Sequence, residues 1–260
     1  MSEIKVLPFT DVSLDLADRD FPNVSIIIPC YQRREFIPLI IVNLLCQDYP
    51  HDKLEVVILQ DGPDDLFLTS DHRNVFEEAI FPVKLKYKFE EGIRRSIGEK
   101  RNRLVKMCSN NIIASMDSDD IYLESYLRFS VNALKEHGAG ATSSNAMIFI
   151  YPKINMKSTA IHCPTIDLCH EACTVFTKKY WKSVGGFDKS SQGEGLGFFS
   201  KNSKKVLNLD VSKLMVCVCH GANTIDKNQF ETATEWGGIN ENSTHIKLLR
   251  DLFPEEIVLD

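Results

Sequence analysis

Short apolar runs alternate along the chain with segments in which apolar residues recur every three or four positions. Continuous runs rich in β-branched residues are typical of strands buried on both faces, and the wider spacing is typical of amphipathic helices. In the first half, strands are predicted at residues 24–30, 54–59, 82–89 and 111–116, and helices at 36–47, 71–80, 98–108 and 124–137. Strands that alternate with helices favour a mostly parallel α/β sheet with right-handed connections.

The second half of the chain has a more mixed pattern. Strands are predicted at residues 141–151, 172–177, 206–210 and 214–218, and helices at 177–184 and 245–252. We therefore expect three parts. These are an N-terminal arm over residues 1–22, a main α/β domain over residues 23–222, and a C-terminal extension over residues 223–260 that packs on the main domain.

The composition narrows the class of protein. Of the 260 residues 43% are hydrophobic and 25% are charged, so a sizeable core is expected. The net charge of −6 and the absence of a Lys/Arg run disfavour nucleic-acid binding. The sequence shows neither a signal-peptide pattern nor an apolar segment long enough to span a membrane, so a soluble cytoplasmic protein is expected. A homo-oligomeric state and a place as one module of a longer chain both stay open.

Three carboxylates follow the strand predicted at residues 111–116. Asp117, Asp119 and Asp120, with Ser118 among them, stand where a buried strand of such a sheet ends, and ligands bind at that edge. Two carboxylates at a strand end can bind one hard divalent cation. The alternative is a solvated turn in which Asp119 or Asp120 caps the helix that follows.

Two further segments suggest a nucleotide site. Asp61 ends the second predicted strand, where its carboxylate can accept hydrogen bonds from a base or a ribose, or can simply shape a turn. Lys100 and Arg101 lie in the first turn of a predicted helix, where the backbone amides also attract anions. The alternative for this helix is a basic face in contact with solvent.

The last candidates lie in the second half. Glu194, between two glycines, is a candidate general base or else part of an exposed loop. His220 follows the strand that holds Cys217 and Cys219, and is a candidate third ligand for the Asp119 metal or a hydrogen-bonded histidine at a strand end. A zinc site with Cys163, Cys169, His170 and Cys173 is a weaker alternative. Strand alternation places Cys217 and Cys219 on one face, where they are expected to pack as small hydrophobic residues.

Taken in order, the motifs of this chain resemble those of the inverting family-2 glycosyltransferases of the GT-A fold, over about residues 24–200. The matching segments are residues 24–33 (VSIIIPCYQR), 57–62 (VILQDG), 98–102 (GEKRN), 116–120 (MDSDD) and 185–188 (GGFD). The resemblance implies a GT-A catalytic domain over residues 23–222, with a smaller mixed half on the side of the acceptor.

The resemblance also implies a role for each matching residue. Pro29, Tyr31 and Arg33 line the nucleotide crevice, Asp61 binds the base, Lys100 and Arg101 lie near the nucleotide, Asp117, Ser118 and Asp119 form the D-x-D motif, and Glu194 is the base. The chain departs from the family at two places. Glycine follows Glu194 where the family has a second acid, and Gln60 precedes Asp61 where the family often has another aspartate.

The expected reaction is a single displacement on a nucleotide-sugar, most simply a UDP-sugar. Mn²⁺ or Mg²⁺, held by Asp119 with Asp117 and His220, offsets the charge of the leaving diphosphate. Glu194 takes the proton of an acceptor hydroxyl on a glycan or glycoconjugate. The alternatives are a retaining GT-A enzyme, a nucleotidyltransferase, which would normally have a glycine-rich phosphate loop, and an inactive carbohydrate-binding protein of the same fold.

Overall fold

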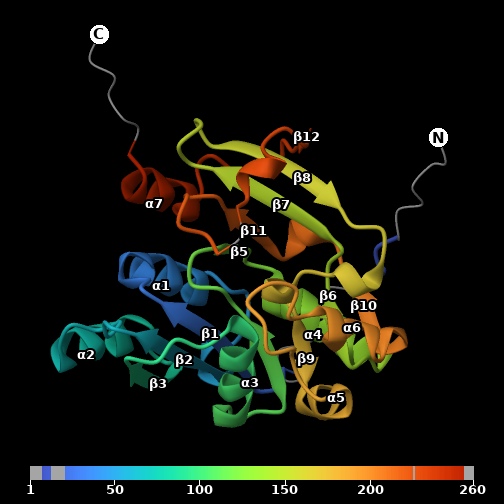
Figure 1. The fold of residues 1–260 in the computed structure, drawn as a ribbon, viewed down its shortest axis with the longest axis horizontal. Coiled ribbons are helices and arrows are strands. Elements are labelled where there is room, and N and C mark those ends of the chain that lie inside the picture. Colours follow the sequence, from blue (N-terminus) through green and yellow to red (C-terminus); the bar gives the residue numbers. More distant parts are fainter. Residues whose placement is uncertain (1–7, 13–20, 225, 255–260) are drawn as a thin grey trace.

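The central sheet of the protein has seven strands, as seen in a computed structural model that describes residues 8–12, 21–224 and 226–254 (Figure 1). Its strand order is β10–β6–β9–β4–β1–β2–β3. The strands are β1 (Val24–Tyr31), β2 (Leu54–Gly62), β3 (Lys84–Glu91), β4 (Ile112–Ser115), β6 (Ala141–Ser143), β9 (Val175–Thr177) and β10 (Val206–Asn208). Strands β4, β1, β2 and β3 are parallel to one another, whereas β9 is antiparallel to both of its neighbours. The prediction of a mostly parallel α/β sheet is confirmed.

Helices cover both faces of this sheet. They are α1 (Ile37–Leu45), α2 (Ser70–Ala79), α3 (Ile97–Met107), α4 (Tyr126–His137), α5 (Lys178–Val184) and α6 (Leu196–Ser200). Ile26 and Ile28 of β1 belong to the cluster that contains Leu44 of α1, whereas Ile27 packs in the cluster that contains Leu104 of α3. Alternate residues of one strand thus enter two cores, which explains its continuous apolar run.

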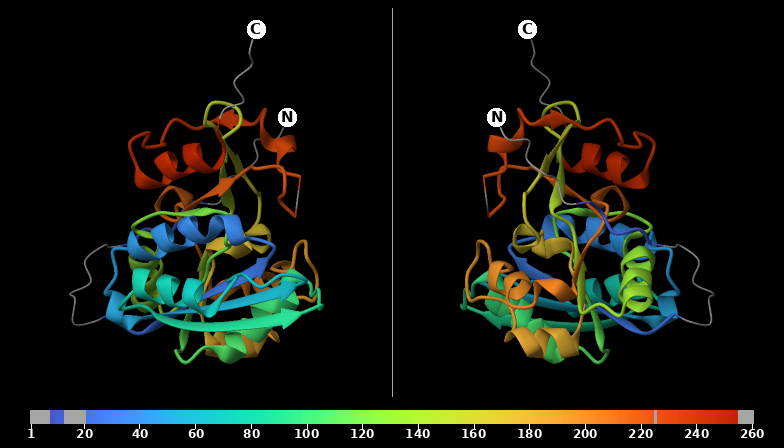
Figure 2. Two further views of the ribbon diagram at one scale, coloured as in Figure 1. Left: turned by 90° about the vertical axis from the view of Figure 1, so that its left-hand side faces the viewer. Right: turned by 90° about the vertical axis from the view of Figure 1, so that its right-hand side faces the viewer.

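A second sheet lies on one side of the first, together with helix α7 (Thr244–Leu252) (Figure 2). Its order is β12–β8–β7–β11–β5. The strands are β5 (Ile121–Tyr122), β7 (Ala146–Tyr151), β8 (Lys157–His162), β11 (Met215–Val218) and β12 (Thr234–Glu235). Ile246 and Leu249 of α7 join Phe36 and Leu39 in a third apolar cluster.

The structure corrects the prediction of one strand over residues 141–151. Two strands lie there, and β6 belongs to the central sheet while β7 belongs to the second. The break falls at Ser144 and Asn145, both buried, where the Asn145 amide group donates to the Cys163 carbonyl and its backbone N–H donates to Asn208. These polar bonds hold the chain at the point where it changes sheets. Strands β5, β8 and β12 were not predicted.

The division of the chain into three parts remains a prediction. The boundaries at residues 22 and 222 are not tested by the fold, and most of the N-terminal arm, residues 1–7 and 13–20, lies outside the described residues. Within the described ranges, none of the helices is long and apolar enough to cross a membrane.

Candidate active site

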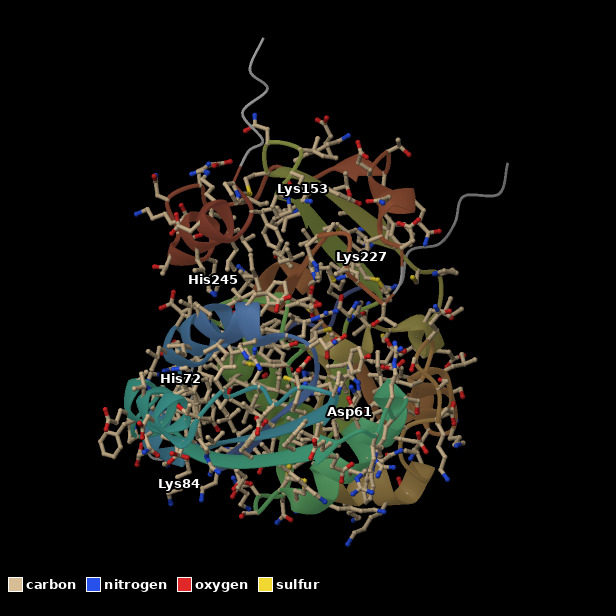
Figure 3. The ribbon with its side chains drawn as sticks, turned by 60° about the vertical axis from the view of Figure 1, so that its left-hand side comes forward. Asp61, His72, Lys84, Lys153, Lys227 and His245 are labelled. Atoms are coloured by element: carbon tan, nitrogen blue, oxygen red, sulfur yellow. The ribbon has the colours of Figure 1, made fainter. Side chains whose placement is uncertain are left out.

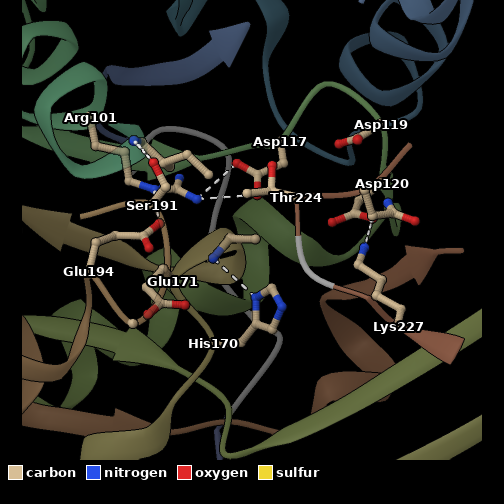
Figure 4. A pocket seen from close by; sticks show the side chains of 14 residues that line it. Arg101, Asp117, Asp119, Asp120, His170, Glu171, Ser191, Glu194, Thr224 and Lys227 are labelled. Carbon is tan, nitrogen blue, oxygen red and sulfur yellow. Dashed lines mark hydrogen bonds and ion pairs between the residues drawn. The ribbon is translucent and has the colours of Figure 1, made fainter. Parts of the chain in front are cut away.

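A cavity lies beside the acidic segment that follows β4 (Figure 4). Its wall brings together residues from α3, from the acidic segment, from the turn before β9, from the loop before α6 and from the segment after β11. Its lining residues are Ile97, Arg101, Asp117, Asp119, Asp120, His170, Glu171, Ala172, Ser191, Gly193, Glu194, Asn223, Thr224 and Lys227. Four predicted site residues thus meet in one place: Arg101, Asp117, Asp119 and Glu194.

Arg101 joins two of the acids. Its side chain is buried, with 1% of its surface exposed. Its Nη2 lies 2.9 Å from Asp117 Oδ1, and its Nε lies 3.2 Å from Glu194 Oε1. Burial opposes the charge, but the carboxylates of Asp117, Glu194 and Glu171 raise the pKa of Arg101 above its ordinary value. The guanidinium therefore stays charged and fixes the positions of Asp117 and Glu194 relative to each other.

Asp119 contacts two basic side chains. Its Oδ2 lies 3.0 Å from His220 Nε2 and 3.2 Å from Arg33 Nε. Arg33 also donates to the Ala222 carbonyl at 2.8 Å, so it connects the segment after β1 to the loop after β11. Burial works to raise the pKa of Asp119, but the hydrogen bond with His220 and the charges of Lys227 and Arg33 hold it well below its usual range. The Asp119 carboxylate is therefore ionised.

Asp120 has a different role. Its Oδ1 accepts the Val218 N–H at 2.8 Å and lies 3.1 Å from Lys227 Nζ. Burial raises the pKa of Asp120 to about 6, against the opposing charge of Lys227. The alternative in which an acid of this segment caps the next helix is wrong, because β5 comes first and the N-cap of α4 is Ser125, which makes no side-chain capping bond. Asp120 instead joins the segment before β5 to β11 and to Lys227.

Asp61 lies apart from the cavity, at the end of β2 (Figure 3). It is fully buried, its Oδ1 is 2.8 Å from Lys100 Nζ, and its Oδ2 accepts the Arg95 N–H at 2.7 Å. The Tyr31 ring lies against Gly62, where a Cβ would come within 2.8 Å of the ring, and the Arg94 guanidinium lies 4.5 Å from the centre of that ring. Tyr31, Asp61 and Arg94 thus form a second group at the strand ends.

The remaining predicted residues lie around these two groups. Pro29 pairs with Leu59 in the register of β1 with β2. Ser118, between Asp117 and Asp119, is buried. Pro29, Tyr31, Arg33, Asp61, Lys100, Ser118 and His220 are not among the residues that line the cavity.

The cysteines are free thiols, and burial raises the pKa of Cys173 and of Cys219 to about 11. Cys217 Sγ lies 3.6 Å from His170 Nε2. Across the part of the chain that the structure describes, no three His, Cys, Asp or Glu side chains form a metal-binding group. The Asp119–His220 pair therefore offers two protein ligands, and further ligands would have to come from a bound molecule.

Sequence reasoning missed the charged cavity residues Glu171 and Lys227, and it named His170 only as a candidate zinc ligand. All three come from segments that match no motif of the predicted site. Burial and the charges of Lys227 and Arg101 lower the pKa of His170 to about 3, so its imidazole is neutral. No local signal marks such residues, since only the folding of the second half brings them to the acidic segment.

Comparisons with known proteins give a consistent picture. A model of the family "Glycosyl transferase family 2" matches residues 25–183, more than half of the chain. Poly(ribitol-phosphate) beta-N-acetylglucosaminyltransferase TarS of Staphylococcus aureus (strain Mu50) is 27% identical over 113 residues, which make up 44% of this chain and 19% of that protein. The UDP-forming cellulose synthase catalytic subunit of Pseudomonas fluorescens is 27% identical over 123 residues, 47% of this chain and 15% of that subunit. The chain thus matches less than a fifth of the length of either relative.

Solved structures of low sequence identity share the fold. Mannosyltransferase PcManGT from Pyrobaculum calidifontis, in complex with GDP-Man and Mn²⁺, has a TM-score of 0.62 at 21% identity, over 85% of this chain and 62% of that one. S. aureus TarS 1–349 in complex with UDP has a TM-score of 0.60 at 17% identity, over 75% and 60% of the two chains.

Proposed function

The chain belongs to glycosyl transferase family 2, and from this premise we propose that it is a metal-dependent inverting enzyme that transfers sugar from a UDP-sugar to a hydroxyl group of a glycan or glycoconjugate. The predicted family, the GT-A fold and the glycosyltransferase class are confirmed. What we propose beyond this is that the enzyme depends on a metal, that it inverts the anomeric configuration, that the donor is a UDP-sugar and that the acceptor is a glycan or glycoconjugate.

The observation that carries the proposal is the Asp119–His220 pair at the end of β4. Asp119 Oδ2 and His220 Nε2 are 3.0 Å apart, close to the ~3 Å that separates neighbouring ligands around an octahedral ion with bonds of about 2.1 Å. A carboxylate and an imidazole suit Mn²⁺ and related divalent ions. Mg²⁺ is bound in many proteins by one or two carboxylates together with substrate phosphates, so a two-ligand site fits a diphosphate donor.

Asp119 and His220 would hold the ion directly, with Asp117 at its side. When bound, such an ion stabilises the negative charge on the departing diphosphate. Arg101 fixes Asp117 at 2.9 Å, and Arg33 holds Asp119 from the other side at 3.2 Å. Lys227 supplies a positive charge at the same wall, and its pKa is raised by Asp120 against the effect of burial. These cations favour binding of an anionic donor.

We propose that the nucleotide lies along the ends of β1 and β2, next to Pro29. Tyr31 offers a ring face, Asp61 a carboxylate, and Lys100 and Arg101 positive charge near the nucleotide. Of the neighbours, TarS was crystallised with UDP and UDP-GlcNAc, and PcManGT with GDP-Man. We favour UDP because the relatives detected by sequence include TarS and the UDP-forming cellulose synthase subunit.

The acceptor oxygen must attack from the side opposite the diphosphate, since one base and one leaving group on opposite faces of the sugar give inversion. Glu194 is our candidate for the base. Its carboxylate lines the cavity and is held by Arg101 at 3.2 Å. The acceptor proton passes to the Glu194 carboxylate while the acceptor oxygen forms a bond to the anomeric carbon.

A donor screen tests the proposal. We expect release of free nucleotide from UDP-sugars to exceed release from GDP- and dTDP-sugars, and to require Mn²⁺ or Mg²⁺. We also expect UDP with Mn²⁺ to raise the melting temperature more than the sum of the two separate effects, because a ligand held through the metal stabilises only the native state. Equal release in the presence of a chelator would contradict the metal dependence, and no release from any donor would favour an inactive binding protein.

Product stereochemistry separates the proposal from its nearest rival. NMR of the product should show the anomeric configuration opposite to that of the donor. Retention would indicate a retaining enzyme of the same fold.

Asp61→Asn tests the nucleotide site. We expect UDP affinity to fall by about 1–3 kcal/mol, the range for a hydrogen bond to a charged group. Titration calorimetry with UDP measures this loss. Because the substitution also leaves the buried Lys100 amine without its carboxylate partner, the melting temperature must be measured alongside. Unchanged UDP affinity in a folded Asp61→Asn protein would mean that the nucleobase binds elsewhere.

A further inference from the structure

Two carboxylates share one wall of the cavity (Figure 4). Glu194 lies in the loop before α6, and Glu171 lies in the single 3-10 turn Glu171–Cys173 that precedes β9. The two segments are more than twenty residues apart in the sequence, and the fold places them next to each other. Nothing in the local sequence of Glu171 marks it as part of the site.

Gly195 allows this close approach. Its N–H donates to Glu171 Oε1 at 2.9 Å. A Cβ at this position would lie 2.4 Å from Glu171 Cγ and 2.8 Å from Glu171 Oε1, so any side chain at residue 195 would displace the Glu171 carboxylate. The backbone of Gly195 is in the ordinary right-handed helical region, with φ −83° and ψ −16°. A Cβ would also lie 2.8 Å from the Phe199 ring, so the absence of a side chain here is required by Glu171 and Phe199 and not by the backbone.

The groups around Glu171 make its carboxylate a stronger proton acceptor than an exposed glutamate. Burial and the negative charge of Glu194 raise the pKa of Glu171 to about 7, and the Gly195 N–H and the Arg101 charge only partly oppose them. His170, on the same turn, is neutral because its pKa is lowered to about 3. The other charged groups that line this cavity are Arg101, Lys227, Asp117, Asp119 and Asp120. Glu194, by contrast, is joined to Arg101.

We propose that Glu171 is a second catalytic carboxylate, which forms with Glu194 one interacting pair that takes up the proton of the acceptor hydroxyl. This inference rests on the proposed transfer reaction. In the step, the acceptor O–H bond breaks and its proton goes to the pair. The oxygen lone pair forms the new bond to the anomeric carbon, and the bond from that carbon to the diphosphate breaks with its electrons on the diphosphate. Interacting carboxylates bind their first proton as a unit, at a higher pH than either would alone.

Glu171→Gln separates this role from a structural one, because the amide oxygen can still accept the Gly195 N–H. We expect kcat to fall on the order of 10²-fold, with KM for the donor unchanged. The acid limb of the kcat profile should move from near pH 7 to lower pH, since one carboxylate remains without a negatively charged neighbour. Asp210→Asn is the matched control. Asp210 also accepts a backbone N–H, from Ser212 at 2.9 Å, but it lies outside the cavity, so kcat and its acid limb should stay unchanged.

An unchanged kcat and acid limb in Glu171→Gln, with the wild type active, would overturn the pair and leave the proposed function intact. A readout without turnover keeps the two separate. In carboxyl-labelled protein, ¹³C NMR should show one glutamate that titrates near pH 7, and this signal should vanish in Glu171→Gln and move to lower pH in Glu194→Gln. An ordinary titration of both glutamates would also overturn the pair. A wild type that transfers no sugar would contradict the proposed function alone.

Discussion

Replacement of Asp119 by asparagine should lower metal-dependent transfer at least a hundredfold, on the order of 3 kcal/mol or more of transition-state stabilisation. The amide keeps the shape of the side chain but removes the charge that faces His220 and Arg33. We expect the melting temperature of the free protein to fall, because the ionised carboxylate is stabilised by its basic neighbours in the folded state, and the additional stabilisation by Mn²⁺ with UDP should disappear. Paramagnetic resonance of Mn²⁺ in the presence of UDP measures the loss of binding directly.

Two companion variants sharpen the Asp119 result. Asp251→Asn removes an exposed carboxylate of α7, outside the cavity, and should leave Mn²⁺ binding unchanged. Asp119→Asn/His220→Asn should be little worse than Asp119→Asn alone, because two ligands of one ion act as a unit and their losses do not add. Full activity of Asp119→Asn with an unaltered metal requirement would show that Asp119 is not a metal ligand.

The first half of the fold could be predicted because its signals are local. The apolar run over Ile26, Ile27 and Ile28 predicts a strand covered on both faces, and the structure places these residues in two cores. The acidic segment could be located for the same reason, since the carboxyl ends of parallel strands meet at one edge.

The second sheet could not be predicted in this way. Strand β5 has two residues, and β8 begins after a turn in which Asn155 and Met156 have positive φ angles of 46° and 55°. Such elements owe their structure to the strands beside them and not to their own pattern. For the same reason the approach of Glu171 to Gly195 and of Lys227 to Asp120 leaves no mark in the sequence. Sequence reasoning therefore found the acidic segment, and it found Glu194 and His220 beside local motifs, but it missed Glu171 and Lys227.

Replacement of Glu194 by glutamine should lower kcat by about 10²–10⁴-fold, the usual contribution of a general base. The amide is isosteric, and its oxygen can still accept the Arg101 Nε–H that lies 3.2 Å away in the native protein. Donor binding should stay nearly unchanged, because the metal ligands Asp119 and His220 and the nucleotide group around Asp61 come from other segments. Steady-state assays at saturating donor and acceptor measure kcat, and calorimetry with UDP and Mn²⁺ measures the affinity of the nucleotide site.

The partition between kcat and affinity decides whether Glu194 acts on the acceptor proton. Arg101 also contacts Asp117, so a purely structural Glu194 would disturb Asp117 when it is replaced, and the variant would lose donor affinity but turn over normally at saturation. That result would contradict the base assignment. A base, in contrast, must be ionised to take up a proton, so the wild-type kcat should fall as the pH falls through the titration of the Glu171–Glu194 pair. In Glu194→Gln the residual kcat should no longer follow that titration.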